Sequence, residues 1–144
     1  MAVPLARKLV IDTNVFIDYL RDDLPADWVF GRAGLVIRFL SSIVLLELGL
    51  GADTLKRRRA VDRVRTAFPK ERIIAPSPDL FDRAAVLFRE LHSPGSEPGD
   101  RLGPINDLLI ALTAWRIGAA VLTRNKQDFR RIQAQLPGLR VVTL

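Results

Sequence analysis

The sequence predicts an α/β fold in which a parallel β-sheet is covered by helices on both faces. Short apolar runs that are typical of strands alternate with helical patterns along the whole chain, in the order βαβα. These runs are continuously apolar rather than alternating, as expected when both faces of a sheet are buried. The chain has 144 residues, of which 49% are hydrophobic, and we expect residues 1–144 to form a single domain.

In the first half of the chain, apolar residues 9–11 form a strand that stops at Asp12, and a short helix follows over residues 15–20. Residues 22–34 contain proline and glycine and are expected to form a loop or a broken helix that carries Trp28. The remaining elements of this half are a strand over 35–40, a helix opened by Ser41 that runs to residue 50, an amphipathic helix over 54–68 and a short strand over 72–75.

In the second half, Ser77 followed by proline is a strong helix start, and it leads into a helix that ends near residue 91. Residues 93–104 form the clearest loop in the sequence. After it we expect a helix over 106–116 ended by Gly118, a strand over 119–123, a helix over 128–136 and a last strand over 140–144.

Composition excludes several kinds of chemistry. The chain has no cysteine and one histidine, His92, so disulfides, zinc–thiolate sites, paired-histidine metal sites and a Ser-His-Asp triad are not expected. No apolar stretch approaches the ~20 residues of a membrane span, and charged residues come too early for a secretory signal. We therefore expect a soluble, cytoplasmic protein whose chemistry uses carboxylates, hydroxyls, lysine or arginine.

Four acidic residues stand at positions that such a sheet would bring together. Asp12 and Asp128 follow predicted strands, Asp107 lies near the start of an apolar helix, and Glu47 is the lone acid in another. Strand C-termini of a parallel sheet share one edge, where ligands bind. Each acid also has a structural interpretation, because Asp12, Asp107 and Asp128 are suited to helix starts, although a lone glutamate in an apolar run is costly to bury unpaired.

Four gathered carboxylates would repel one another and raise one another's pKa, so a cation is needed to neutralise them. The donors are all oxygen, which selects a hard ion, Mg²⁺ or Mn²⁺. Such an ion lowers the pKa of a bound water and polarises a phosphoryl oxygen, so phosphodiester hydrolysis by in-line attack needs no histidine base.

The motifs also carry a resemblance. Asp12-Thr13-Asn14, the segment SSIVLLELGLGA with Ser41 and Glu47, NDLLIALTA with Asp107, and LTRNKQDF together resemble the PIN domain family, in particular its VapC-type toxins, over essentially the whole chain. The resemblance implies strand order 3-2-1-4-5 and a Mg²⁺- or Mn²⁺-dependent endoribonuclease that leaves a 5′-phosphate and a 3′-hydroxyl.

The resemblance also implies residue roles. Asp12, Glu47 and Asp107 match the principal catalytic, metal-binding acids of the family, and Asp128 matches a frequent fourth, although many members carry that acid where this chain has Asn125. The supporting polar positions, which would orient the acids, are Thr13, Asn14, Ser41, Thr123 and Asn125. The implied partners are an RNA substrate, a small cognate antitoxin and a second copy in a homodimer.

The charge balance agrees with a nucleic-acid substrate. Lysine and arginine number 22 against 16 acids, giving a net charge of +6 and a pI near 10.7, although an arginine-rich surface alone would give the same values. The candidates for contacts with the RNA backbone, each of which can equally be a solvated side chain, are Arg58, Arg59, Arg63, Arg124 and Lys126.

Two other functions compete with this hypothesis. A PIN-like domain that binds RNA or protein without cutting would keep the same sequence pattern. A phosphoaspartyl phosphotransferase or receiver domain also places an aspartate after a parallel strand, but here no acid stands two residues beyond Asp12 and no conspicuous strand-end lysine follows.

Overall fold

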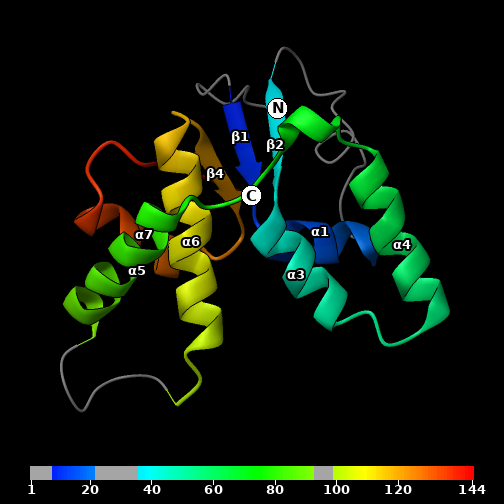
Figure 1. Cartoon of the computed structure of the whole chain (residues 1–144), viewed down its shortest axis with the longest axis horizontal. Helices are drawn as coiled ribbons and strands as arrows, with labels where there is room; N and C mark the ends of the chain where they lie inside the picture. The colour runs from blue at the N-terminus through cyan, green and yellow to red at the C-terminus, as the bar shows by residue number, and fades with distance from the viewer. Residues whose placement is uncertain (1–7, 22–35, 93–98) are drawn as a thin grey trace.

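The computed structural model describes residues 8–21, 36–92 and 99–144. The elements in this part of the chain are β1 (Lys8–Ile11), α1 (Thr13–Leu20), β2 (Ile37–Ser41), α3 (Ser42–Leu50), α4 (Leu55–Thr66), a 3₁₀ turn η1 (Lys70–Arg72), β3 (Ile73–Ile74), α5 (Pro78–Leu91), α6 (Leu102–Arg116), β4 (Ala120–Thr123), α7 (Lys126–Gln135) and β5 (Arg140–Thr143), as drawn in Figure 1. The loop expected at 22–34, with Trp28, lies outside the described residues, and the single domain over 1–144 stays a prediction.

The strands form one five-stranded sheet in the order β3-β2-β1-β4-β5, with every neighbouring pair parallel. Both the α/β class and the order 3-2-1-4-5 are therefore confirmed. In the central strand, Val10 pairs with Phe39 on one side and Val121 on the other. This order differs from the 2-1-3-4-5 order of flavodoxin-like receiver folds, which removes the structural basis for the receiver alternative.

The core is built on the two central strands. Leu9, Val10 and Ile11 of β1 and Val121 and Leu122 of β4 are fully buried, which explains why these runs are apolar without alternation. Helix α6 packs against both strands and against α3, α5 and α7. In Figure 1, α5, α6 and α7 gather on the left of the strands, while α3 and α4 lie on the right. Sequence alternation therefore correctly indicated helices flanking a buried parallel sheet.

Several helices begin where a side chain caps them. Ser41 and Thr54 accept hydrogen bonds from the backbone N–H groups of Ile43 and Arg57, at 3.1 Å each. Ser77 occupies the cap position of α5 but its hydroxyl donates to the Asp79 carboxylate, so it makes no side-chain cap bond. The ring of Pro78 still fixes the first helical residue, and the predicted start of α5 is confirmed.

Three predicted helix starts are wrong, since α1 begins at Thr13 rather than at 15, and the other two errors affect Asp107 and Asp128. Helix α6 begins at Leu102, inside the predicted loop 93–104, because Pro104 lies in the first turn, where a backbone N–H has no helical partner to lose. Helix α7 begins at Lys126 rather than 128. Gly118 and Gly138, with φ of +69° and +93°, follow the two helices and allow the chain to turn back into a strand. Among the helices of the described segments, none is both long and apolar enough to span a membrane.

Candidate functional site

Asp12 lies at the carboxyl end of β1 and is 3% exposed. One carboxylate oxygen accepts from the Thr13 backbone N–H at 2.8 Å, which is the helix-cap role, and the other accepts from the Thr123 hydroxyl at 2.7 Å. The backbone N–H of Asp12 also donates to the Leu122 carbonyl at 2.9 Å. The structural interpretation of Asp12 as a cap is thus confirmed, but the cap accounts for only one oxygen of a carboxylate that also joins β1 to β4.

Glu47 is linked to the same edge of the sheet through Thr13, the residue that follows Asp12. The Thr13 hydroxyl donates to Glu47 Oε1 at 2.6 Å, so Thr13 touches one acid with its backbone and another with its side chain. Glu47 lies on the sixth position of α3, and this bond satisfies part of the requirement that a half-buried carboxylate be paired. Ser41, expected to support the acids, is buried and instead caps α3 through Ile43.

Asp107 is the sixth residue of α6, so it is neither a cap nor a first-turn acid, and that structural alternative is wrong. Burial, and then the charges of Asp12, Glu47 and Asp128, raise its pKa from 3.8 to about 8. The charges of the three other acids therefore all act on Asp107, and that of Glu47 also acts on Asp12. Burial raises the pKa of Asp12 to about 6, although the bonds from Thr123 and Thr13 oppose that rise.

Asp128 and Asn125 are joined to each other. Asp128 is exposed in the first turn of α7, and the Asn125 side-chain amide donates to its Oδ2 at 2.7 Å. The backbone N–H of Asn125 donates to the Thr123 hydroxyl at 2.9 Å, which fixes the loop that follows β4. The Asn125 amide and the Asp128 carboxylate, which are the two candidates for the fourth metal-binding group, therefore lie side by side.

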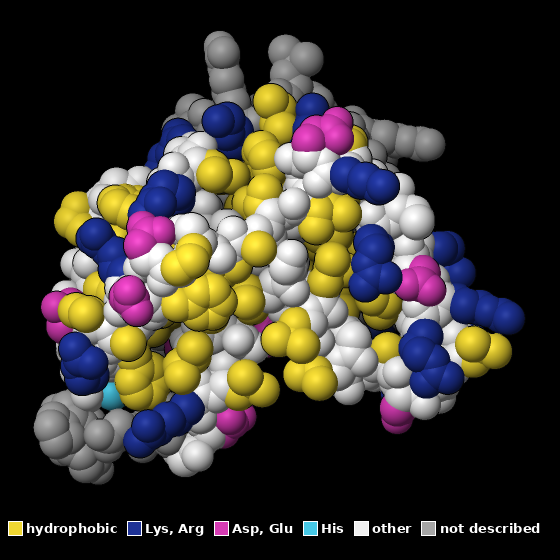
Figure 2. All heavy atoms as spheres, viewed as in Figure 1, with side chains coloured by type: hydrophobic (Ala, Val, Ile, Leu, Met, Phe, Trp, Pro, Cys, Tyr) yellow, Lys and Arg dark blue, Asp and Glu magenta, His cyan; other side chains and the backbone are white. Residues whose placement is uncertain are grey.

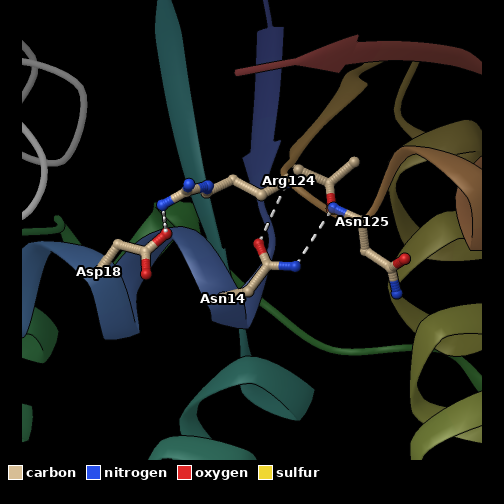
Figure 3. Close-up of polar contacts among 5 residues, drawn as sticks. Asn14, Asp18, Arg124 and Asn125 are labelled. Atoms are coloured by element: carbon tan, nitrogen blue, oxygen red, sulfur yellow. Dashed lines mark hydrogen bonds and ion pairs between the residues drawn. The ribbon is translucent and has the colours of Figure 1, made fainter.

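Figure 3 shows how α1 holds the loop after β4. The side-chain oxygen of Asn14 accepts from the Arg124 backbone N–H at 3.2 Å, and its side-chain nitrogen makes a long contact of 3.5 Å with the Thr123 hydroxyl. The Arg124 guanidinium pairs with Asp18, which is 18% exposed against 49% for the arginine side chain. Arg124 is therefore already engaged with α1, which the sequence did not indicate.

The acids line the edge toward which β1 points. Figure 2 shows that the surface is hollowed at its lower edge, and in the same view the cartoon of Figure 1 places α5–α7 on one side and α3 and α4 on the other. Among the described residues, no three Asp, Glu or His side chains are gathered closely enough to hold a metal ion as they lie. The donors are all oxygen, and burial, together with repulsion by the neighbouring acids, is the reason that the pKa of Asp107 is high.

The cations predicted to contact RNA lie on two sides of the molecule. Arg58, Arg59 and Arg63 are exposed on α4, on the right of Figure 1, while Lys126 is exposed at the start of α7, on the left. Two further arginines of α4 pair with nearby acids: Arg57 with Asp53 at 2.6 Å and Arg65 with Asp62 at 3.0 Å.

Sequence reasoning missed Asn106, which precedes Asp107 and is 4% exposed. Its side-chain nitrogen is buried and has no hydrogen-bond partner within the described part of the protein. Such a group is costly unless another molecule satisfies it, so it stands out beside the acids. The available signal was a polar side chain inside an otherwise apolar helical run.

The strand order and the acidic edge define a small α/β domain with a carboxylate site above the sheet. The chain belongs to the PIN domain family, whose model matches residues 9–135. No curated protein sequence is significantly similar to it.

Solved structures of toxin–antitoxin systems share the fold. A chain of VapBC2 from Rickettsia felis, bound to a DNA fragment from their promoter, superposes with a TM-score of 0.69 at 22% identity, over 95% of this chain and 98% of that one. DNA-bound VapBC from Salmonella typhimurium gives 0.68 at 24% identity, with 94% and 97% covered. A toxin–antitoxin complex from Klebsiella pneumoniae gives 0.60 at 28% identity, with 94% and 96% covered.

Proposed function

We propose that this PIN domain is a divalent-metal-dependent endoribonuclease and the toxin of a toxin–antitoxin pair. The observation that carries the proposal is that the charges of Asp12, Glu47 and Asp128 all act on the part-buried Asp107, while the Thr123 hydroxyl holds Asp12 and the Thr13 hydroxyl holds Glu47. Family membership supports nuclease chemistry, and the similarity to VapBC structures supports the toxin assignment.

The residues present fit a Mg²⁺ or Mn²⁺ ion. Asp12, Glu47 and Asp107 would hold it, with Asp128 or the Asn125 amide oxygen as a further donor, and every one of these donors is an oxygen. Mg²⁺ keeps several of its waters, so the four carboxylates need not all touch it as they lie. A bound cation would also relieve the repulsion that raises the pKa of Asp107.

The bound ion would supply an activated water and a polarised phosphoryl oxygen. The chain's own residues orient the acids: the Thr123 hydroxyl fixes Asp12, and the Thr13 hydroxyl fixes Glu47. Asp107 holds a proton at neutral pH in the absence of a neutralising charge, because its pKa is about 8. The Asn14 side chain accepts from the backbone of Arg124, and the backbone of Asn125 donates to the Thr123 hydroxyl. These two bonds fix the loop after β4 and keep Thr123 in place.

The proposal includes partners. An antitoxin is supported by the toxin–antitoxin complexes that share this fold. A homodimer is supported by exposed apolar side chains on the helices, among them Phe81 and Val86 of α5, which are 50% and 43% exposed. We place the toxin and its antitoxin in the cytoplasm, where the RNA substrate of the toxin is found.

The test is cleavage of a pool of structured RNAs by purified protein with Mg²⁺, with Mn²⁺ and with a chelator. Asp12→Asn removes a buried carboxylate of the site, and Asp62→Asn is the matched control because Asp62 is exposed on α4. We expect metal-dependent cutting by the wild type and by Asp62→Asn, and a loss of at least ~100-fold in Asp12→Asn. Metal binding without any cutting would favour the binding-only alternative, and cutting that Asp12→Asn retains would refute the assignment of the site.

A further inference from the structure

The Thr123 hydroxyl joins the loop after β4 to the acids. It donates to Asp12 Oδ2 at 2.7 Å and accepts from the backbone N–H of Asn125 at 2.9 Å. The side-chain nitrogen of Asn14 makes its long contact of 3.5 Å with the same oxygen. A hydroxyl has one hydrogen to donate and two lone pairs that accept. Because N–H groups occupy the accepting side, the hydrogen is directed to Asp12, and the hold on this carboxylate depends on the loop.

The same loop holds a second acid. The Asn125 side-chain amide donates to Asp128 Oδ2 at 2.7 Å, so the loop and the end of β4 supply the donors of both Asp12 and Asp128. Glu47, by contrast, takes its donor from Thr13 on α1. A shift of the loop would therefore move the donors of two acids and leave the donor of Glu47 in place.

Helix α1 holds the loop at Arg124. The side-chain oxygen of Asn14 accepts from the backbone N–H of Arg124 at 3.2 Å, and the Asp18 carboxylate pairs with the guanidinium. Asn14 and Asp18 are four residues apart and therefore share one face of the helix. Figure 3 shows the side chain of Arg124 running to α1, whereas that of Asn125 leaves the loop in the opposite direction. Helix α1 thus holds Arg124 both by its backbone and by its side chain.

The Asp18–Arg124 pair differs from the other ion pairs of the described residues. The Asp18 side chain is 18% exposed, whereas the acids of the three other pairs are between 61% and 71% exposed. Exposed pairs contribute little because water screens them, and a carboxylate that is mostly withdrawn from water gains more from a fixed cation. The pair also joins segments that are 106 residues apart in the chain. These properties suit a restraint on the loop.

We propose that Asp18 and Arg124 are positioning residues of the acidic site. Their ion pair holds the loop after β4, and the loop in turn fixes the carboxylates of Asp12 and Asp128. This inference rests on the proposed metal-dependent function and extends the site to a pair of side chains that hold no metal themselves. The role is separate from the contact with the RNA backbone that the sequence predicted for Arg124.

The test uses variants that remove either side of the pair. Asp18→Ala removes the acceptor, Arg124→Gln removes the charge, and the double variant removes both. Arg124→Lys is the conservative variant, because its ammonium can still pair with Asp18. Arg65→Gln is the matched control, since Arg65 forms an exposed ion pair with Asp62 on α4 at 3.0 Å. Two quantities are measured: hydrogen exchange of the Arg124 and Asn125 backbone amides by NMR in chelator, and Mn²⁺ affinity by calorimetry.

We expect the two amides to exchange about fivefold faster in Asp18→Ala and Arg124→Gln, as for the loss of one ion pair, and at the wild-type rate in Arg65→Gln. The Kd for Mn²⁺ should rise about fivefold in each single variant, which is less than the ~10–100-fold for loss of a direct partner of a metal ligand. The double variant should be no worse than either single variant, because both changes remove the same contact. Arg124→Lys should recover most of the affinity.

Unchanged amide exchange in Asp18→Ala and Arg124→Gln would overturn the proposal. Faster exchange with unchanged Mn²⁺ affinity would also overturn it, because the pair would then stabilise the loop without positioning the acids. So would additive losses of affinity in the double variant, since the two side chains would then act independently. A wild type that binds no Mn²⁺ refutes the proposed function instead, and amide exchange in chelator then still decides whether the pair holds the loop.

Discussion

Replacing Asp107 by asparagine tests whether burial and the charges of the neighbouring acids destabilise an ionised Asp107 in the folded protein. The pKa of Asp107 rises from 3.8 to about 8 through burial and then the charges of Asp12, Glu47 and Asp128. Because the folded state then holds a proton that the unfolded state has lost, stability without metal is fully present below about pH 4 and falls as the pH rises toward 8. Asparagine keeps the shape of the side chain and cannot ionise.

The size of the effect follows from the pKa. At ~1.4 kcal/mol for each pKa unit, the change from 3.8 to about 8 corresponds to roughly 5 to 6 kcal/mol. Asp107 is part-buried rather than fully buried, so solvent screens part of this cost, and we expect Asp107→Asn to stabilise the metal-free protein at pH 8 by about 3 kcal/mol.

The change in the free energy of unfolding is measured by urea denaturation, monitored by circular dichroism, at pH 5 and pH 8, with chelator and with Mg²⁺. The stabilisation should be small at pH 5, and Mg²⁺ should stabilise the wild type but not Asp107→Asn. Equal destabilisation by Asp107→Asn at both pH values in chelator would refute the reasoning, because it would give Asp107 an ordinary structural role.

Three further variants probe the polar shell of the site. Thr13→Val removes the hydroxyl that donates to Glu47, and cleavage should fall about tenfold while the melting temperature changes little; unchanged cleavage would contradict this role. Asn106→Leu should raise the free energy of unfolding by about 1 kcal/mol because a buried amide without a partner is removed; strong destabilisation would show that the amide is satisfied. Asp18→Asn should change stability by less than about 1 kcal/mol, since Arg124 is half exposed, and should raise RNA affinity about twofold by freeing the guanidinium; weaker binding would argue against RNA contact by Arg124.

The sequence predicted the parts of the fold that depend on local pattern. Continuous apolar runs located β1 and β4, and the position of Asp12 after β1 followed from where the apolar run stops. The start of α6 was missed because glycine and proline favour loops, whereas Pro104 is tolerated in a first helical turn. That error alone made Asp107 resemble a first-turn acid.

What the sequence could not predict is contact between segments distant in the chain. Nothing local indicates that Arg124 pairs with Asp18, 106 residues away, or that the Thr13 hydroxyl donates to Glu47, 34 residues away. A cleft of about 310 Å³ beside Asp107 is a further case, since it needs three helices in their final places before Gly103 and Arg131 line the same space. The acids were predictable as a group because parallel strands share one carboxyl edge, while their supporting bonds were not.

The most direct measurement is calorimetric titration of the protein with Mn²⁺ at pH 7 in two buffers of different ionisation enthalpy. Because the pKa of Asp107 is about 8, a metal bound by the four acids must displace about one proton, and the measured heat must depend on the buffer. We expect the wild type to release about one proton when it binds Mn²⁺, and we expect Asp107→Asn to release none. Absence of Mn²⁺ binding, or binding that releases no proton and is unchanged in Asp107→Asn, would contradict the assignment of these acids as the metal site.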